Sequence, residues 1–400
     1  MYLERLLLEE FRQYRHEVID IPERGLALHG ANASGKSTLM EAIALLSTTK
    51  SPRTSSDREM IGWESGRELG FPPFARIEGS VCRVSGPVEL EVGMSAEHAD
   101  ATTVKKQLKL NGRSVRASSI VGQLRSVLFT PEDVALVSGP PSDRRRYLDL
   151  TLCQIDPGYM RALTVYARVL SQRNSLLKRF SRDGANPRAS SVTAELRYWD
   201  DELVMAGSMI ISRRVQSIAQ LSRVAALEYG RLDGGELALA YAPALGESVH
   251  DVDQVSSRDG AAFALHQELD RRRTEEVRRG VTLSGPHRDD LIISIGRRSA
   301  ASFASRGQQR LAVLALKLGE AALMTELTGD APVVLLDDIL SELDERHRGL
   351  VLETAASMQC QMLITSTDRR LLDAPIVRDL ERREVIAGMV RGDADEGRSE

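Results

Sequence analysis

Two kinds of apolar pattern predict strands in this chain. Apolar and polar residues alternate loosely over residues 3–21 and 74–127, which predicts antiparallel strands with one covered face. Unbroken apolar runs at Val333–Leu336 and Met362–Ile364 instead predict strands buried on both faces. A helix-length segment separates the two runs, so we expect them to pair in parallel within a βαβ unit.

The middle of the chain has a helical period. Apolar or aromatic residues recur at close to every 3.5 positions over residues 159–177 and again over 196–210. A break rich in Gly, Asn, Pro and Ser at 184–191 separates these stripes, which predicts an antiparallel helical hairpin. A third helix is predicted to continue toward Gly234, and another to cover residues 263–277. Packing within this arm accounts for the stripes without a cofactor.

The composition adds limits on function. The 400 residues are 42% hydrophobic and 28% charged, as in a soluble globular protein, and suffice for one large α/β domain and a smaller one. No apolar run approaches the ~18 residues of a membrane span, and Met1–Arg5 does not resemble a secretion signal, so we expect a cytoplasmic location. The net charge is −4, so any DNA binding must come from local basic patches.

One loop matches the phosphate-cradling pattern G-x-x-x-x-G-K-[ST] completely. Its residues are Gly30, Ala31, Asn32, Ala33, Ser34, Gly35, Lys36, Ser37 and Thr38. The glycines let backbone N–H groups point at phosphate oxygens, Lys36 supplies a positive charge to the β- and γ-phosphates, and Ser37 can ligate Mg²⁺. An apolar strand precedes the loop and a helix follows it, which favours a nucleotide site over a merely glycine-rich turn.

Three further segments carry groups that such a site needs. Asp337 and Asp338 directly follow a predicted buried strand, where carboxylates are wanted to organise Mg²⁺ and polarise water; the alternative is an acidic turn. The segment Ser305–Arg310 precedes an amphipathic helix, whose start offers a second anion site. Arg12 lies between the first two predicted strands and can approach a phosphate, although a surface arginine fits its spacing equally well.

Two runs of three arginines are candidates for contacts with DNA phosphates. They are Arg144, Arg145 and Arg146 where a loop opens a helix, and Arg271, Arg272 and Arg273 inside another helix. A charge run is more often a solvated face, and the spacing does not decide between the two interpretations. Phosphate contacts would make binding salt-sensitive without sequence preference.

Several motifs together carry a family resemblance. They are Phe11–Tyr14, Phe129–Asp149, Arg173–Lys178, Ser284–Asp290, Phe303–Arg310 and Leu335–Asp344. With the phosphate loop, these motifs resemble the SMC branch of the ABC-type ATPases and, within it, the RecF family of bacterial DNA replication and repair proteins. The motifs are spread from the first predicted strand almost to the last.

The resemblance implies an α/β fold, an ABC-type, SMC-like P-loop ATPase head with a short helical arm. Residues 1–150 would form the N-terminal part of the head, 151–235 the arm, and 236–391 the C-terminal part with the signature motif, Walker B and D-loop. Residues 392–400 are rich in Asp, Glu and Gly, so a disordered tail is expected there.

The resemblance also implies site roles, in which two heads face each other and enclose two ATP molecules. It assigns catalysis to Lys36, Asp337, Asp338 and Ser305; nucleotide contacts to the loop, Arg12, Ser305, Gly307 and Gln308; Mg²⁺ to Ser37 and Asp337; and the dimer interface to Ser341 and Asp344. Asp338 would polarise the attacking water, and the signature residues of one copy would cap the γ-phosphate held by the other.

The implied function is that of an ATP-gated DNA clamp in the cytoplasm, associated with the nucleoid. ATP and Mg²⁺ are the expected cofactors, and ATP would hold a homodimer together until weak, DNA-stimulated hydrolysis releases it. The expected partners are duplex and gapped DNA and RecR, with RecO and RecA in the same pathway and no membrane. RecA loading at single-stranded gaps would be the outcome.

Three positions depart from the family pattern. Arg306 stands where relatives often have Gln, which changes the charge beside the γ-phosphate cap. Asp338 replaces the glutamate of most ABC ATPases, and its shorter reach fits slow hydrolysis. Thr365–Thr367 stand where ABC transporters place a histidine.

Two other functions compete with a repair role. An ATPase subunit of a transporter, or another non-DNA ABC-type switch, fits the head, but a transporter subunit does not fit the helical arm or the missing histidine. A small-molecule P-loop kinase would not need Ser305–Arg310 and should stay monomeric with ATP.

Overall fold

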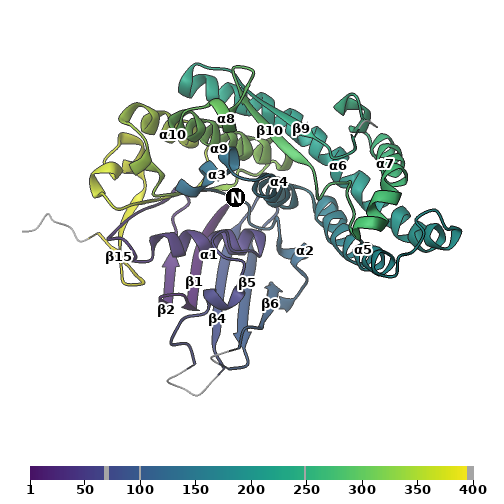
Figure 1. Cartoon of the computed structure of the whole chain (residues 1–400). Helices are drawn as coiled ribbons and strands as arrows, with labels where there is room; N and C mark the ends of the chain where they lie inside the picture. The colour runs from purple at the N-terminus through teal and green to yellow at the C-terminus, as the bar shows by residue number, and fades with distance from the viewer. Residues whose placement is uncertain (67–71, 99–100, 247–248, 394–400) are drawn as a thin grey trace, which may run out of the picture. The chain divides into compact units, whose positions relative to one another are not determined.

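The computed structural model describes residues 1–66, 72–98, 101–246 and 249–393. Contacts divide the chain into two compact units, and Figure 1 labels several of their elements. Met1–Asp133 and Val313–Glu400 form the first unit, and Val134–Ala312 forms the second. The second unit is therefore an insertion between two parts of the first.

The described strands of the first unit form two sheets. They are β1 Tyr2–Phe11, β2 Tyr14–Asp20, β3 Gly25–His29, β4 Phe74–Cys82, β5 Val88–Ala96, β6 Val104–Leu110, β7 Arg113–Ser114, β8 Ser126–Phe129, β12 Val333–Asp337, β13 Met362–Ser366, β14 Glu381–Ile386 and β15 Met389–Gly392. One sheet has the order β2-β1-β4-β5-β6-β7 and is antiparallel. The other has the order β15-β14-β3-β13-β12-β8 and is parallel except for the β14–β15 hairpin.

These sheets confirm the strands predicted from the two apolar patterns. The runs at Val333–Leu336 and Met362–Ile364 lie in β12 and β13, which pair in parallel as expected. One detail differs, because β8 begins at the end of the alternating region, where an antiparallel strand was expected, but joins the parallel sheet beside β12. Its residues Val127 and Phe129 are buried there.

Helix α1 (Lys36–Thr48) contacts strands of both sheets. Eleven of its thirteen residues are buried, which explains why the stretch Leu39–Leu46 is apolar on every face except at Glu41. Leu28, Ile43, Ile77 and Leu335 belong to the shared apolar cluster of the helix and the sheets. Since the phosphate loop leads directly into this helix, the core fixes the position of the loop.

Helices complete the first unit. They are η1 Asp57–Met60, α2 Ala117–Ile120, η2 Pro131–Val134, η5 Ile339–Glu342, α10 Glu345–Ser357, η6 Arg369–Leu372 and η7 Pro375–Asp379. Helix α9 (Arg306–Thr328) begins in the second unit and ends in the first. Among the described residues, none of the helices is both long and apolar enough to span a membrane.

The second unit is mainly helical. Its elements are α3 Ala135–Ser138, α4 Pro141–Ile155, α5 Pro157–Arg182, α6 Ser190–Asp233, β9 Leu237–Ala242, η4 Val252–Val255, α7 Arg258–Arg279, β10 Asp290–Ile295, β11 Arg298–Ser299 and α8 Ala300–Phe303. Helices α5, α6 and α7 pack against one another, as Figure 1 shows, and the strands form an antiparallel sheet in the order β11-β10-β9. The predicted hairpin with a break at 184–191 is thus confirmed.

The structure differs from the expected helices at one place. The second and third predicted helices are a single helix, α6, of 44 residues. Its Gly207 lies where a Cβ would come within 2.7 Å of a methyl group of Leu265, so this glycine serves close packing and does not end the helix.

The compact units also divide the chain differently from the expected domains. The predicted arm, 151–235, lies inside the second unit, but residues 236–312 cluster with it and not with the head. The reason is that β9 and α7 both pack on α6. At the predicted tail, β15 includes Gly392, and the Asp393 carboxylate pairs with His29 and Arg369; residues 394–400 lie outside the described residues.

Candidate nucleotide site

The phosphate loop joins β3 to α1 and has the backbone that only glycine allows at its two ends. Gly35 has φ 124°, and a Cβ there would lie 2.8 Å from the hydroxyl oxygen of Tyr14. At Gly30, with φ 152°, a Cβ would lie 2.3 Å from the carbonyl oxygen of Val385. Neither position admits a side chain, so the curl that brings backbone N–H groups together depends on both glycines.

Lys36 is the first residue of α1, and its ammonium lies over the loop. Its Nζ donates to the carbonyl oxygens of Gly30, at 2.8 Å, and Ala31, at 2.9 Å. Burial lowers the pKa of Lys36, and the carboxylates of Asp338 and Asp337 oppose this shift. The structure therefore brings the predicted lysine and both predicted carboxylates together.

Asp337 is the last residue of β12 and binds hydroxyl groups from two other elements. Its Oδ1 accepts hydrogen bonds from Ser37 Oγ, at 2.9 Å, and from Thr365 Oγ1, at 2.8 Å. Burial raises the pKa of Asp337, and the hydrogen bonds from Thr365 and Ser37 counteract this. Carboxylate and hydroxyl oxygens side by side are ligands that suit Mg²⁺, so the predicted pair fits this ion. Thr365 had no predicted role in the site.

Asp338 adopts a left-handed backbone, with φ 51°. Its N–H donates to Thr365 Oγ1 at 2.9 Å, and its carbonyl oxygen accepts from Ser341 Oγ at 2.7 Å. The side-chain Oδ1 is buried and has no hydrogen-bond partner within the described residues. A buried polar atom without a partner, on a strained backbone, is a common feature of functional sites. This oxygen can accept a hydrogen bond from a bound water.

The turn between β1 and β2 contacts the loop in a way that the sequence analysis missed. The Tyr14 hydroxyl donates to the carbonyl oxygen of Gly35 at 3.0 Å. Gln13 Oε1 accepts from Thr38 Oγ1 at 3.1 Å. Both contacts are to the start of α1, so the motif Phe11–Tyr14 positions the phosphate loop.

Arg12, from the same motif, is held by a buried carboxylate. Its Nε and Nη2 donate to Glu41 Oε2 and Oε1 at 2.5 and 2.7 Å. Ser51 Oγ also donates to Glu41, at 2.5 Å, and Arg53 Nη1 lies 3.6 Å from the same carboxylate. Glu41 was missed, although one acidic residue inside an apolar helix was a usable signal. Arg12 thus lies next to the helix of the phosphate loop, and its contact with a phosphate stays a prediction.

Ser305 and Gln308 cap the start of α9 reciprocally. Ser305 Oγ accepts from the N–H of Gln308 at 3.2 Å, and Gln308 Oε1 accepts from the N–H of Ser305 at 3.1 Å. Ser305, Arg306 and Gly307 are exposed. Because Ser305 Oγ is the acceptor in its hydrogen bond with the N–H of Gln308, its own proton is available to donate to an anion. The predicted contact with a partner's γ-phosphate stays a prediction.

Asp344 has a local structural role in addition to its predicted one. It is the N-cap of α10, and its carboxylate accepts from the N–H of His347 at 2.9 Å and lies 2.8 Å from His347 Nδ1. Hydrogen bonds from His347 lower the pKa of Asp344. Asp344 and Ser341 are both exposed, and their place in a dimer interface stays a prediction.

Most of the predicted DNA-contacting arginines are ion-paired within the chain. Arg144 is buried, and its Nε and Nη2 donate to Asp290 at 2.7 and 2.9 Å. In the other run, the carboxylate partners are Glu268 for Arg271, Glu268 and Glu275 for Arg272, and Asp200 and Asp270 for Arg273. The structure thus assigns Arg144 to the framework and largely neutralises the second run.

Comparison with known proteins defines the class first. The family model described as the RecF/RecN/SMC N terminal domain matches residues 2–378. A solved SMC head bound to the C-winged helix domain of ScpA has a TM-score of 0.52 at 15% identity, over 98% of this chain and 96% of that one, which shows a shared fold alone. The fold is that of an SMC-like, ABC-type ATPase head.

Closer relatives define the family. The chain is 43% identical to the DNA replication and repair protein RecF of Chloroflexus aggregans, over 98% of this chain and 99% of that one. It is 34% identical to RecF of Bacillus subtilis over 98% of both. The solved structure of the recombination mediator protein RecF-ATPrS in the RecFOR pathway has a TM-score of 0.84, at 28% identity and over 98% of both chains. This chain belongs to the RecF family.

Proposed function

We propose that this protein is an ATP-dependent DNA-binding protein of recombinational repair. It dimerises on ATP, binds duplex DNA at single-strand gaps and helps load the RecA recombinase together with RecR. The observation that carries the proposal is the convergence of Lys36, Ser37, Asp337 and Asp338 around the phosphate loop. The proposal is further supported by the names of the relatives, which are DNA replication and repair proteins and a RecF-ATP structure in the RecFOR pathway.

The residues of the site divide the work. The loop Gly30–Thr38 binds the triphosphate through its N–H groups and Lys36, while Ser37 and Asp337 hold Mg²⁺. When bound, MgATP would supply phosphate charge that residues of both copies contact, and a phosphoanhydride bond whose hydrolysis lets the two copies separate. Asp338 accepts a hydrogen bond from the attacking water and orients it. Its carboxylate is one methylene shorter than a glutamate, which fits weak, slow hydrolysis.

The second copy contributes the rest of the site. Ser305, with its proton free to donate, caps the γ-phosphate together with Gly307 and Gln308. Ser341 and Asp344 lie between the two copies. Family membership weighs against the transporter and kinase alternatives. The helical arm of this chain is not needed by a transporter subunit, and the segment Ser305–Arg310 is not needed by a kinase.

Substitution of Lys36 by Met tests dimerisation. We expect wild type to form a dimer in sedimentation velocity with ATP and Mg²⁺, and Lys36→Met to stay monomeric because its loop cannot hold the triphosphate charge. Lys50→Met is the matched control, since Lys50 is exposed and lies just after the end of the same helix. An ATP-dependent dimer in Lys36→Met equal to that of wild type would refute the mechanism.

DNA binding is tested by the fluorescence anisotropy of a labelled duplex with ATP, with ADP and without nucleotide. Binding in ATP alone is the expected result, because dimerisation builds the DNA site. Equal binding in all three conditions, or none, would contradict an ATP-gated clamp.

A further inference from the structure

Two arginines of the second unit have no acidic partner among the residues that the structure describes. Arg145, from α4, donates through Nη1 to the carbonyl oxygen of Asp289 at 2.8 Å. Arg288, which precedes β10, is exposed and has only a long contact, of 3.5 Å, from Nη2 to the carbonyl oxygen of Thr282. A backbone carbonyl orients a guanidinium without cancelling its charge, so this place keeps two positive charges.

An uncharged histidine, His287, belongs to the same segment as Arg288 and contacts the same carbonyl oxygen. The Tyr166 hydroxyl lies 2.7 Å from His287 Nδ1, and His287 Nε2 lies 3.3 Å from the carbonyl oxygen of Thr282. Burial lowers the pKa of His287 to about 4, the positive charges of Arg288 and Arg145 contribute, and the hydrogen bond to Thr282 opposes the shift. Arg145 binds the carbonyl oxygen of Asp289, the residue after Arg288, and Arg288 shares the carbonyl oxygen of Thr282 with His287, so both guanidiniums contact the backbone of one short segment and form one patch.

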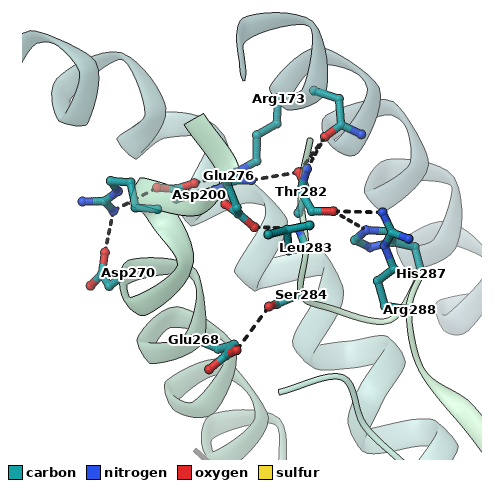
Figure 2. A network of polar contacts seen from close by, with 12 residues as sticks. Arg173, Asp200, Glu268, Asp270, Glu276, Thr282, Leu283, Ser284, His287 and Arg288 are labelled. Carbon is teal, nitrogen blue, oxygen red and sulfur yellow. Dashed lines mark hydrogen bonds and ion pairs between the residues drawn. The ribbon is translucent and has the colours of Figure 1, made fainter. Parts of the chain in front are cut away.

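A buried network fixes the segment that carries this patch, as Figure 2 shows. Arg173 is fully buried and donates to Asp200 and Glu276, each at 2.7 Å, and to Thr282 Oγ1 at 2.8 Å. The carbonyl oxygen of Thr282 in turn faces His287 and Arg288. The motifs Arg173–Lys178 and Ser284–Asp290, which the nucleotide site does not use, thus meet here.

The patch differs from the other arginine runs in charge compensation. Glu268 alone accepts hydrogen bonds from both Arg271 and Arg272, and Arg273 lies between two carboxylates. Binding a phosphate through those arginines would require breaking existing ion pairs. Arg145 and Arg288 can bind an anion with no such loss.

We propose that Arg145 and Arg288 form a contact surface for the phosphate backbone of duplex DNA. Planar guanidiniums match the paired oxygens of a phosphodiester and bind them without reading sequence. Because the net charge of the chain is −4, the molecule as a whole does not attract a polyanion. DNA therefore needs a local patch of uncompensated positive charge. The inference rests on the proposed function, because DNA is the polyanion that this function requires.

The test is duplex anisotropy in ATP over a range of salt concentrations, with wild type, Arg288→Glu, Arg288→Ala and Arg272→Ala. We expect Arg288→Glu to weaken binding about tenfold, and Arg288→Ala to lower the slope of log K against log salt by about 1. Arg272→Ala, the matched control, should bind as wild type does. Circular dichroism identifies any variant that fails to fold, and Arg288→Ala keeps the test decisive if Arg288→Glu does.

Other outcomes separate this proposal from the proposed function. If wild type binds the duplex in ATP and both Arg288 variants keep its affinity and slope, the surface is refuted and the function stands. If wild type does not bind, the function itself fails, and this surface with it. A second assay measures binding to poly-L-glutamate. If Arg288→Glu binds the duplex as wild type does but no longer binds poly-L-glutamate, the proposal is overturned, and the partner of the patch is an acidic protein segment.

Discussion

The nucleotide site and the Arg173 network are both polar and buried, but the three charged groups at the centre of the network are fully paired, and only Arg273 Nε at its edge is buried without a partner among the described residues. No side-chain nitrogen or oxygen of Arg173, Asp200 or Glu276 lacks a partner in the described part of the chain. At the site, Asp338 Oδ1 and Ser34 Oγ are buried without one, and Asp338 has a left-handed backbone. Buried charges that are fully paired stabilise the fold. The unpaired polar atoms of the nucleotide site instead remain able to bind a ligand, at some cost in stability.

Removal of Arg173 should have the largest effect on stability. Arg173→Met leaves Asp200 and Glu276 buried without their main cation, and we expect a loss of about 3–5 kcal/mol in the free energy of unfolding. The measurement is urea unfolding followed by the fluorescence of Trp199, in a background where the exposed Trp63 is replaced by Phe.

Arg179→Met is the control for that experiment. Arg179 pairs with Glu195 at the surface, and we expect its loss to cost under about 1 kcal/mol. Equal losses in the two variants would show that the buried network contributes no more than a surface ion pair.

Asp338→Asn should have the opposite effect to Arg173→Met. We expect it to lose ATPase activity and to keep its stability. We expect phosphate release from ATP to fall about a hundredfold, because an amide is a poor acceptor for the proton of water. The free energy of unfolding should not fall, since Asn tolerates a positive φ and carries no charge to leave unpaired. Asp379→Asn, at an exposed ion pair with Arg24, is the control. A large loss of stability in Asp338→Asn would place this residue in the framework instead.

The smallest expected effect is a pH dependence of the second unit. The pKa of His287 is about 4 in the folded protein and near 6.5 in an unfolded chain. The unfolded chain therefore binds more protons between these values, so stability is complete above pH 6.5 and declines as the pH falls toward 4. The wild-type Tm should drop more between pH 7 and pH 5 than that of His287→Gln.

His266→Gln is the control for this experiment. His266 is exposed, so this variant should show the same drop in Tm as wild type. A wild-type drop no larger than that of His287→Gln would contradict this explanation.

The fold and the nucleotide loop could be predicted because their signals are local. The glycines of the loop predict positions where the backbone adopts a positive φ, and Gly30 and Gly35 both have one. The apolar run Val333–Leu336 predicts burial on both faces, and β12 is an interior strand that pairs with β13 on one side and β8 on the other. The family resemblance paired Ser37 with Asp337, 300 positions apart, and a hydrogen bond joins them.

Sequence by itself thus determined the order of strands and helices, the phosphate loop and the carboxylates beside it, since spacing and residue type report backbone shape and burial. Only the tertiary structure decided which arginines keep their charge. Arg144 meets Asp290, and Arg173 meets Glu276, across more than a hundred positions. It also placed Glu41 under Arg12, in the core of the first unit. Ion pairing depends on distance in space and on burial, and no local pattern encodes the approach of two segments so far apart.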